Sequence, residues 1–139
     1  MRAKSTRRRL GQAALVLAAV TTASIITVPP AFADASCDRG EYCIYEDAGF
    51  TGDVYTTAGY LANYGNIRMT TSDWHGIGAL LNNSTSSWIN NGYTGAYSRV
   101  RVYREPNNVG EMWSGVPGQT SSYVGNGNND DASSHRWTN

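Results

Sequence analysis

The sequence repeats one short segment, and this repeat constrains the fold more than any other feature. The two copies, which align without gaps, are "IYEDAGFTGDVYT" (44–56) and "VYREPNNVGEMWS" (102–114). Each copy reads as a strand–turn–strand hairpin, and its key positions are Tyr45, Phe50 and Gly52 in the first copy and Tyr103 and Gly110 in the second. We expect each glycine to adopt positive φ and to leave room for the tyrosine ring over a folded-back hairpin. The repeat predicts two copies of one hairpin unit.

The rest of the chain after residue 33 also reads as short strands. β-favouring runs occupy 42–46, 53–57 and 99–104, and Gly- and Asn-rich segments separate such runs. Val100 and Val102 alternate with polar residues, which is the period of a strand with one buried face. Helical periodicity is almost absent. The pattern predicts an all-β sandwich.

A second repeat follows the hairpins. "NNSTSS" (82–87) and "NDDASS" (129–134) both fit the pattern Asn/Asp-Asn/Asp-x-x-Ser-Ser, and each copy follows its own hairpin. Amide, carboxylate and hydroxyl oxygens are the ligands that Ca²⁺ prefers, whereas transition metals favour histidine and cysteine. Two other interpretations are open. The same side chains satisfy backbone groups in tight turns, and Asn83-Ser84-Thr85 fits an N-glycosylation acceptor, which the bacterial character of the N-terminus argues against.

Together these motifs resemble a known family. "YEDAGFTG" resembles the signature hairpin of the βγ-crystallins, and "CDRGEYCIYEDAGFTG" resembles a secreted actinomycete branch classed with the microbial metalloproteinase inhibitors. The resemblance covers nearly all of 37–137 and implies two Greek-key motifs, about 37–92 and 93–139, in one βγ-crystallin-like β-sandwich. The second hairpin departs from the pattern, because Asn108 replaces the phenylalanine and Arg104 replaces Glu46.

The resemblance also implies up to two calcium ions, each bound across the pair of motifs. Ser86 would bind one ion with Asn129 and Asp130, assisted by a main-chain carbonyl near Glu46, and Asp131 is available to help. Ser133 would bind the other ion with Asn82 and Asn83. We expect unequal sites, because the second set offers only neutral amides and hydroxyls while the first includes a carboxylate.

The N-terminus reads as an export signal. Five basic residues precede an apolar run that ends in Ala31-Phe32-Ala33, so we expect a secretory signal over 1–33 and a secreted, extracellular domain over 34–139. A membrane anchor fits less well, and the arginines allow either general or twin-arginine export. Removal of the signal leaves six arginines against eleven acidic residues, a net charge near −5. This charge disfavours nucleic acid and anionic membranes as partners.

Cys37 and Cys43 are the two cysteines of the chain. An oxidising compartment and a small domain favour a disulfide between them. The alternative, a metal or redox pair, fits poorly, because their spacing is not that of a C-x-x-C site and only His75 and His135 are available to complete one.

Three functions remain after an enzyme is disfavoured by the absence of a G-x-S-x-G elbow or a nucleophile beside a base. The first is an inhibitor of a secreted metalloproteinase, although the second disulfide of the founding inhibitors is missing. The second is a calcium-stabilised structural or cell-envelope module. The third is glycan binding on exposed aromatics, drawn from the tyrosines and from Trp74, Trp88, Trp113 and Trp137. We expect a monomer, and we interpret His75 within "DWHGIG" as a loop residue.

Overall fold

The computed structural model describes residues 37–73 and 76–139. The expected signal segment 1–33, Trp74 and His75 lie outside the described residues. The described part contains nine β-strands and no helix: β1 (Tyr42–Asp47), β2 (Thr51–Thr57), β3 (Arg68–Thr70), β4 (Ile77–Leu80), β5 (Ser87–Asn90), β6 (Arg99–Glu105), β7 (Val109–Gly115), β8 (Thr120–Ser121) and β9 (Ser134–Thr138). Accordingly, it includes no helix long and apolar enough to span a bilayer.

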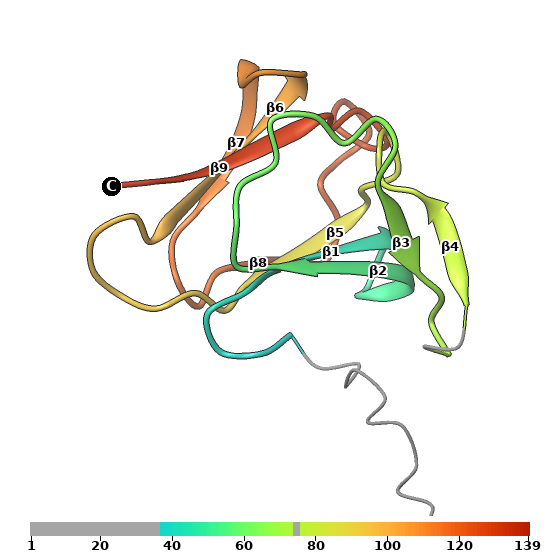
Figure 1. Ribbon diagram of the computed structural model, residues 1–139, viewed down its shortest axis with the longest axis horizontal. Coiled ribbons are helices and arrows are strands. Elements are labelled where there is room, and N and C mark those ends of the chain that lie inside the picture. The colour runs from blue at the N-terminus through green and yellow to red at the C-terminus, as the bar shows by residue number, and fades with distance from the viewer. Residues whose placement is uncertain (1–36, 74–75) are drawn as a thin grey trace, which may run out of the picture. The chain divides into compact units, whose positions relative to one another are not determined.

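The strands form two antiparallel sheets (Figure 1). One is six-stranded in the order β4-β3-β2-β1-β5-β8, and the other is three-stranded in the order β7-β6-β9. The first repeated segment is the β1–β2 hairpin, which pairs Tyr45 with Val54, and the second is the β6–β7 hairpin, which pairs Val102 with Trp113. The all-β prediction and the three strands expected at 42–46, 53–57 and 99–104 are confirmed, with small shifts at their ends.

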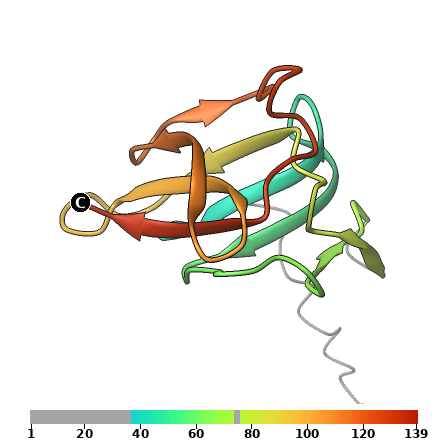
Figure 2. The ribbon, with the colours of Figure 1, turned by 90° about the horizontal axis from the view of Figure 1, so that it is seen from above.

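Each half of the chain has a segment that forms backbone hydrogen bonds with a strand of the other half (Figure 2). β8, from the second half, pairs with β5 of the first, with Trp88 opposite Ser121. In the reciprocal position, Leu61 of the first half forms an isolated bridge with His135 of β9. This exchange of pairing is the Greek-key connection, and it interlocks the two repeats within one domain.

The main core lies between the two sheets. Tyr42 and Ile44 from β1 pack in one cluster with Trp88 from β5 and with Val100 and Val102 from β6. All five side chains are buried, and the valines face inward as their alternation with arginines predicts. Apolar side chains from both sheets therefore hold the sandwich together.

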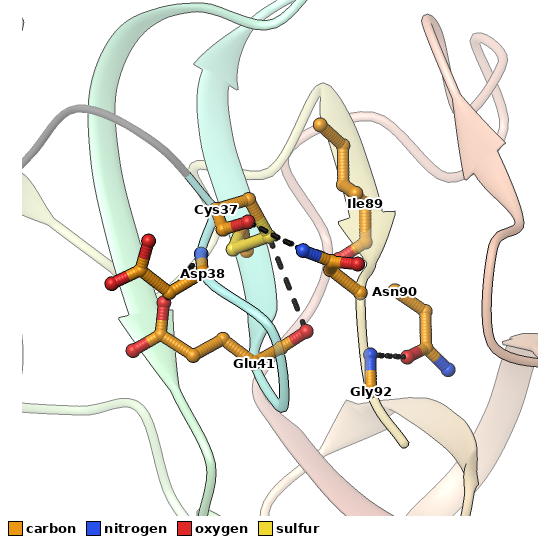
Figure 3. The surroundings of a disulfide bond; sticks show 8 residues. Cys37, Asp38, Glu41, Ile89, Asn90 and Gly92 are labelled. Atoms are coloured by element: carbon orange, nitrogen blue, oxygen red, sulfur yellow. Dashed lines mark hydrogen bonds between the residues drawn. A yellow bond between two sulfur atoms is a disulfide. The ribbon is translucent and has the colours of Figure 1, made fainter. Parts of the chain in front are cut away.

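The other face of β1 is covered by the N-terminal segment. Cys43 and Tyr45 form a second buried cluster with Val54, packed against Cys37 and Phe50. Cys37 and Cys43 form the expected disulfide (Figure 3). Asn91 anchors the same segment, because its Nδ2 donates to the carbonyl oxygen of Cys37 at 2.7 Å. Both faces of β1 are thereby shielded.

One hairpin has no counterpart in the repeat. β3 and β4 extend the edge of the six-stranded sheet. The segment "DWHGIG" was expected to form a loop around His75, but its last two residues, Ile77 and Gly78, lie in β4. Gly78 is where two segments approach closely, since a Cβ there would collide with the carboxylate of Asp53. That carboxylate accepts a hydrogen bond from the backbone N–H of Ala79 at 2.7 Å. The glycine therefore marks a crowded strand and not a loop.

Candidate functional site

The two repeated hairpins share an unusual backbone. Positive φ angles occur at equivalent positions in both: 75° and 61° at Gly49 and Asn107, 63° and 64° at Phe50 and Asn108, and 77° and 72° at Gly52 and Gly110. The expected role of Gly52 is only partly right. A Cβ there would meet the carboxylate and backbone nitrogen of Asp47, whereas the Tyr45 ring packs edge-on against Phe50 at 5.8 Å. The glycine makes room for Asp47.

The last serine of each motif supports its hairpin. Ser87 Oγ donates to the carbonyl of Asp47 at 2.6 Å and accepts from the backbone N–H of Phe50 at 3.0 Å. Ser134 repeats the arrangement, with bonds of 2.7 Å to the carbonyl of Glu105 and 3.2 Å from the N–H of Asn108. Both serines are fully buried. This role was not predicted from the sequence, although the identical spacing of the two serine pairs in the two motifs contained the signal.

The two motifs lie side by side. The backbone N–H of Asn83 donates to the carbonyl of Ala132 at 3.1 Å, and that of Asp130 donates to the carbonyl of Thr85 at 3.2 Å. Asn83 and Asp130 occupy the same position in their motifs, and both have positive φ, 57° and 55°. The pairing is therefore reciprocal, and it places residues of each motif next to residues of the other.

A polar hollow of about 340 Å³ lies at this junction. Its lining residues are Glu46, Asp47, Asn83, Ser84, Ser86, Asn129 and Asp130. This set contains Glu46 and the expected trio of Ser86, Asn129 and Asp130, together with Asp47, which was not predicted from the sequence. Three of the lining residues are acidic and none is basic.

Asn129 gives this hollow an acceptor with no partner. Its Nδ2 donates to Asp130 Oδ2 at 2.6 Å, while its Oδ1 is buried and accepts no hydrogen bond. Ser86 is 7% exposed beside it. Carboxylate, amide and hydroxyl oxygens without a basic neighbour among the lining residues suit a hard cation. Within 37–73 and 76–139, no group of three or more His, Cys, Asp or Glu side chains is arranged for a metal, so amide, hydroxyl or main-chain oxygens would be needed as well.

The equivalent place in the second half is already paired internally. Ser133 Oγ donates to Asn83 Oδ1 at 3.3 Å, so Asn83 is the asparagine that meets this serine. Arg104, at the position equivalent to Glu46, forms an ion pair with Asp131 at 2.6 Å. Asp131 was expected to help Asp130, but its carboxylate is directed to Arg104 instead, because the arginine offers it a charged partner.

His135 belongs to the core. One ring nitrogen, Nε2, lies 3.1 Å from the carbonyl of Gly59, and the other, Nδ1, lies 2.8 Å from the hydroxyl of Tyr64. Because a carbonyl only accepts, Nε2 carries the proton and Nδ1 accepts from Tyr64. Burial lowers the pKa of His135 to about 4, which keeps the ring neutral at pH 7.

The sequence matches a known protein family. The sequence pattern of peptidase inhibitor family I36 matches residues 30–115, more than half of the chain. The chain belongs to this family. Membership points to a peptidase as the partner of this I36 protein. None of the curated proteins compared with it matches.

Solved structures identify the fold. A structure described under the evolution of the eye-lens βγ-crystallin domain fold matches with a TM-score of 0.54 and 18% identity, over 70% of this chain and 84% of the other. A βγ-crystallin from an archaeon matches with a TM-score of 0.50 and 22% identity, over 72% and 99%. One from Ciona intestinalis has a TM-score of 0.50 and 20% identity, over 71% and 100%. The I36 protein therefore has a βγ-crystallin fold, as expected from its hairpins.

Proposed function

We propose that this protein is a secreted inhibitor of a metalloproteinase. The observation that carries the proposal is the match of family I36 across both the disulfide segment and the two repeated hairpins. The export signal expected over 1–33 supports action outside the cell.

The fold supplies the rigidity that an inhibitor needs. A loop held in its bound conformation loses little entropy on binding, and this raises affinity. The disulfide between Cys37 and Cys43 closes the N-terminal segment onto β1. Gly40 N–H donates to the carbonyl of Asn91 at 2.8 Å, and the N–H of Asn91 donates to Glu41 at 2.9 Å. This segment is therefore fixed from both sides.

The test is a titration of a thermolysin-type metalloproteinase with the mature protein. We expect stoichiometric loss of protease activity, with the inhibitor recovered intact by mass spectrometry. A serine peptidase of similar size is the control and should keep its activity. Rapid cleavage of the protein with full protease activity would exclude metalloproteinase inhibition.

Calcium binding at the polar hollow is the second part of the proposal. Glu46, Ser86, Asn129 and Asp130 would contribute oxygens, and the unpartnered Oδ1 of Asn129 supports this assignment. A bound ion would join the β1–β2 hairpin to the second motif and stabilise the domain. This assignment also supports the alternative function, a calcium-stabilised extracellular module with a structural role.

Thermal unfolding with Ca²⁺ and with chelator tests the ion. A ligand that binds only the folded state stabilises it by about 2.7 kcal/mol when its concentration is one hundred times Kd. For a domain of this size that corresponds to a rise in Tm of roughly 10–20 °C. Identical Tm values at millimolar Ca²⁺ and in chelator would exclude calcium binding while leaving inhibition to be judged by the titration.

A further inference from the structure

Two adjoining hollows surround Trp137 of β9. Their volumes are about 560 and 460 Å³, and both are lined by Ala58, Tyr97 and Trp137. The first is completed by Arg39, Gly40, Tyr93 and Ala96, and the second by Gly59, Tyr60, Asn108 and Arg136. We call this surface the aromatic groove. It shares no lining residue with the polar hollow, so it is a separate candidate site.

Aromatic side chains dominate the groove and remain open to solvent. Tyr60, Tyr93 and Tyr97 are 68%, 66% and 68% exposed. Trp137 is held in place, because its Nε1 donates to the carbonyl of Gly59 at 2.9 Å and its ring lies directly against Gly92. Exposed apolar groups that gather in one place mark binding surfaces. A fixed indole surrounded by exposed phenol rings offers flat faces for ring stacking.

The groove also contains an unsatisfied acceptor and a strained residue. Asn108 Oδ1 is buried without a hydrogen-bond partner, so a hydroxyl donor from a ligand would satisfy it. Tyr97 has a φ of 55° and is held there by a hydrogen bond of 2.8 Å from its N–H to Asn139 Oδ1. Strained residues of this kind cluster at ligand-binding sites. These features favour a ligand with hydroxyl groups over a purely apolar one.

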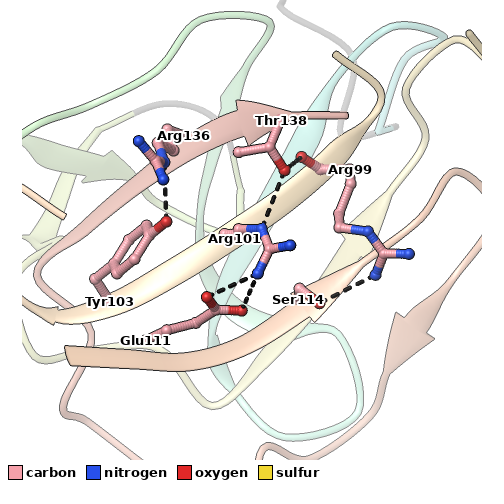
Figure 4. A network of polar contacts seen from close by, with 7 residues as sticks. All are labelled: Arg99, Arg101, Tyr103, Glu111, Ser114, Arg136 and Thr138. Carbon is pink, nitrogen blue, oxygen red and sulfur yellow. Dashed lines mark hydrogen bonds and ion pairs between the residues drawn. The ribbon is translucent and has the colours of Figure 1, made fainter. Parts of the chain in front are cut away.

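The charge of the groove is positive in an acidic domain. Arg39 lies over the Tyr93 ring at 5.5 Å, and Arg136 lies over the Tyr103 ring at 5.7 Å with its Nε donating to the tyrosine hydroxyl (Figure 4). None of the lining residues is acidic. Asp38 and Glu41 are near Arg39 in sequence but do not line the groove. Guanidinium groups bind carboxylates in a bidentate manner, so the groove is suited to an anionic ligand.

We propose that the aromatic groove binds a carboxylate-bearing polysaccharide. Sugar rings would stack on Trp137 and Tyr97, a hydroxyl would donate to Asn108 Oδ1, and the carboxylates would pair with Arg39 and Arg136. Each hollow is of the size of a small-molecule site, and because the two adjoin, a chain of linked rings can fill both. A proline-rich peptide would use the aromatic faces, but it would offer no carboxylate to either guanidinium group and no hydroxyl donor to Asn108.

The experiment is calorimetric titration of the full mature protein with an oligogalacturonate. Its methyl ester, which keeps the rings and removes the charge, is the matched control ligand. The groove variants are Tyr97→Asn, which tolerates positive φ, and Arg136→Gln, with Arg136→Lys to restore the charge. The control variants are Tyr123→Ala and Arg68→Gln, which change an exposed tyrosine and an arginine outside the groove.

We expect the wild-type protein and both control variants to bind the acidic oligomer. Binding should weaken at least ten-fold in Tyr97→Asn, in Arg136→Gln and with the methyl ester, and recover in part in Arg136→Lys. Absence of wild-type binding, equal binding of the methyl ester, or unchanged binding by the folded groove variants would each overturn the proposal. Preference for a proline-rich peptide over the oligomer would overturn it as well. Protease titration of the same variants shows whether inhibition uses a different surface.

Discussion

The two halves of the motif pair have the same backbone and different charges. Asn83 and Asp130 adopt the same positive φ and make reciprocal hydrogen bonds across the pair. In the first half, Glu46 lines a hollow with no basic lining residue. In the second half, Arg104 takes the equivalent position and pairs with Asp131. The scaffold is duplicated, but the electrostatic environment is reversed.

This difference indicates that the backbone of the motif does not by itself determine whether it binds an ion. The first hollow gathers carboxylates and an unpartnered amide oxygen, which a cation from solvent would balance. The second half already has a cation of its own in the guanidinium of Arg104, and a dication there would experience its repulsion. A sequence change at one position therefore separates a candidate ion site from an internal ion pair.

The halves also differ in one buried residue of the core. Because of this residue, low pH should cause the largest loss of stability among the effects predicted below. β5 buries Trp88, whereas β9 buries His135 at the equivalent position. The folded protein keeps His135 neutral because its pKa is lowered to about 4, so the unfolded chain binds more protons below its ordinary value of 6.5. The free energy of unfolding should therefore fall as pH drops from 6.5 to 4, by roughly 3 kcal/mol in total.

Denaturant unfolding in chelator between pH 7 and 4 measures this loss. His135→Gln should remove most of it, while His75→Gln, at the other histidine of the sequence, should retain it. If His135→Gln has the same pH dependence as the wild-type protein, protonation of other groups causes the loss of stability, and His135 does not make the second half more sensitive to acid than the first.

The buried serines test whether the two hairpin supports are equal. Ser87→Ala or Ser134→Ala removes a fully buried hydroxyl and leaves a hairpin carbonyl and a backbone N–H without their partner, at a cost of about 2 kcal/mol for each variant. Chemical unfolding in chelator should give similar losses for both variants, and the exposed Ser122→Ala should change stability by less than about 0.5 kcal/mol. A large difference between the two serines would show that the scaffold is less symmetric than its hydrogen bonds suggest.

The two repeated hairpins could be predicted from the sequence. Repeated tyrosine and glycine spacings predicted both hairpins, because the same local geometry demands the same residues twice. Three features were missed because they depend on contacts between distant segments. These are the β3–β4 hairpin, where Gly78 responds to Asp53, the buried supports Ser87 and Ser134, and the ion pair of Arg104 with Asp131. The substitution of Arg104 for glutamate was visible in the sequence, but its partner was not.

The acidic residues of the second motif should differ in their effect on calcium. Asp130 lines the first hollow, whereas Asp131 pairs with Arg104. Asp130→Asn should weaken calcium binding about ten-fold, or about 1.4 kcal/mol, because it removes a carboxylate from the ion. Asp131→Asn is the matched control and should bind calcium nearly as the wild type does. Calorimetric titration with Ca²⁺ measures both. Equal losses in the two variants would contradict the separation of the two halves.

The smallest effect should come from Arg104 itself. Arg104 and Asp131 have side chains that are 48% and 42% exposed, so Arg104→Gln should cost less than about 1 kcal/mol, and less still in high salt. This variant removes the internal cation but adds no carboxylate, and we expect calcium stoichiometry to remain at one ion. Arg104→Glu recreates the charge of the first half and should raise the stoichiometry to two. One ion in Arg104→Glu would mean that charge at this position does not decide where calcium binds. Two ions in Arg104→Gln would mean that the guanidinium alone had excluded the second.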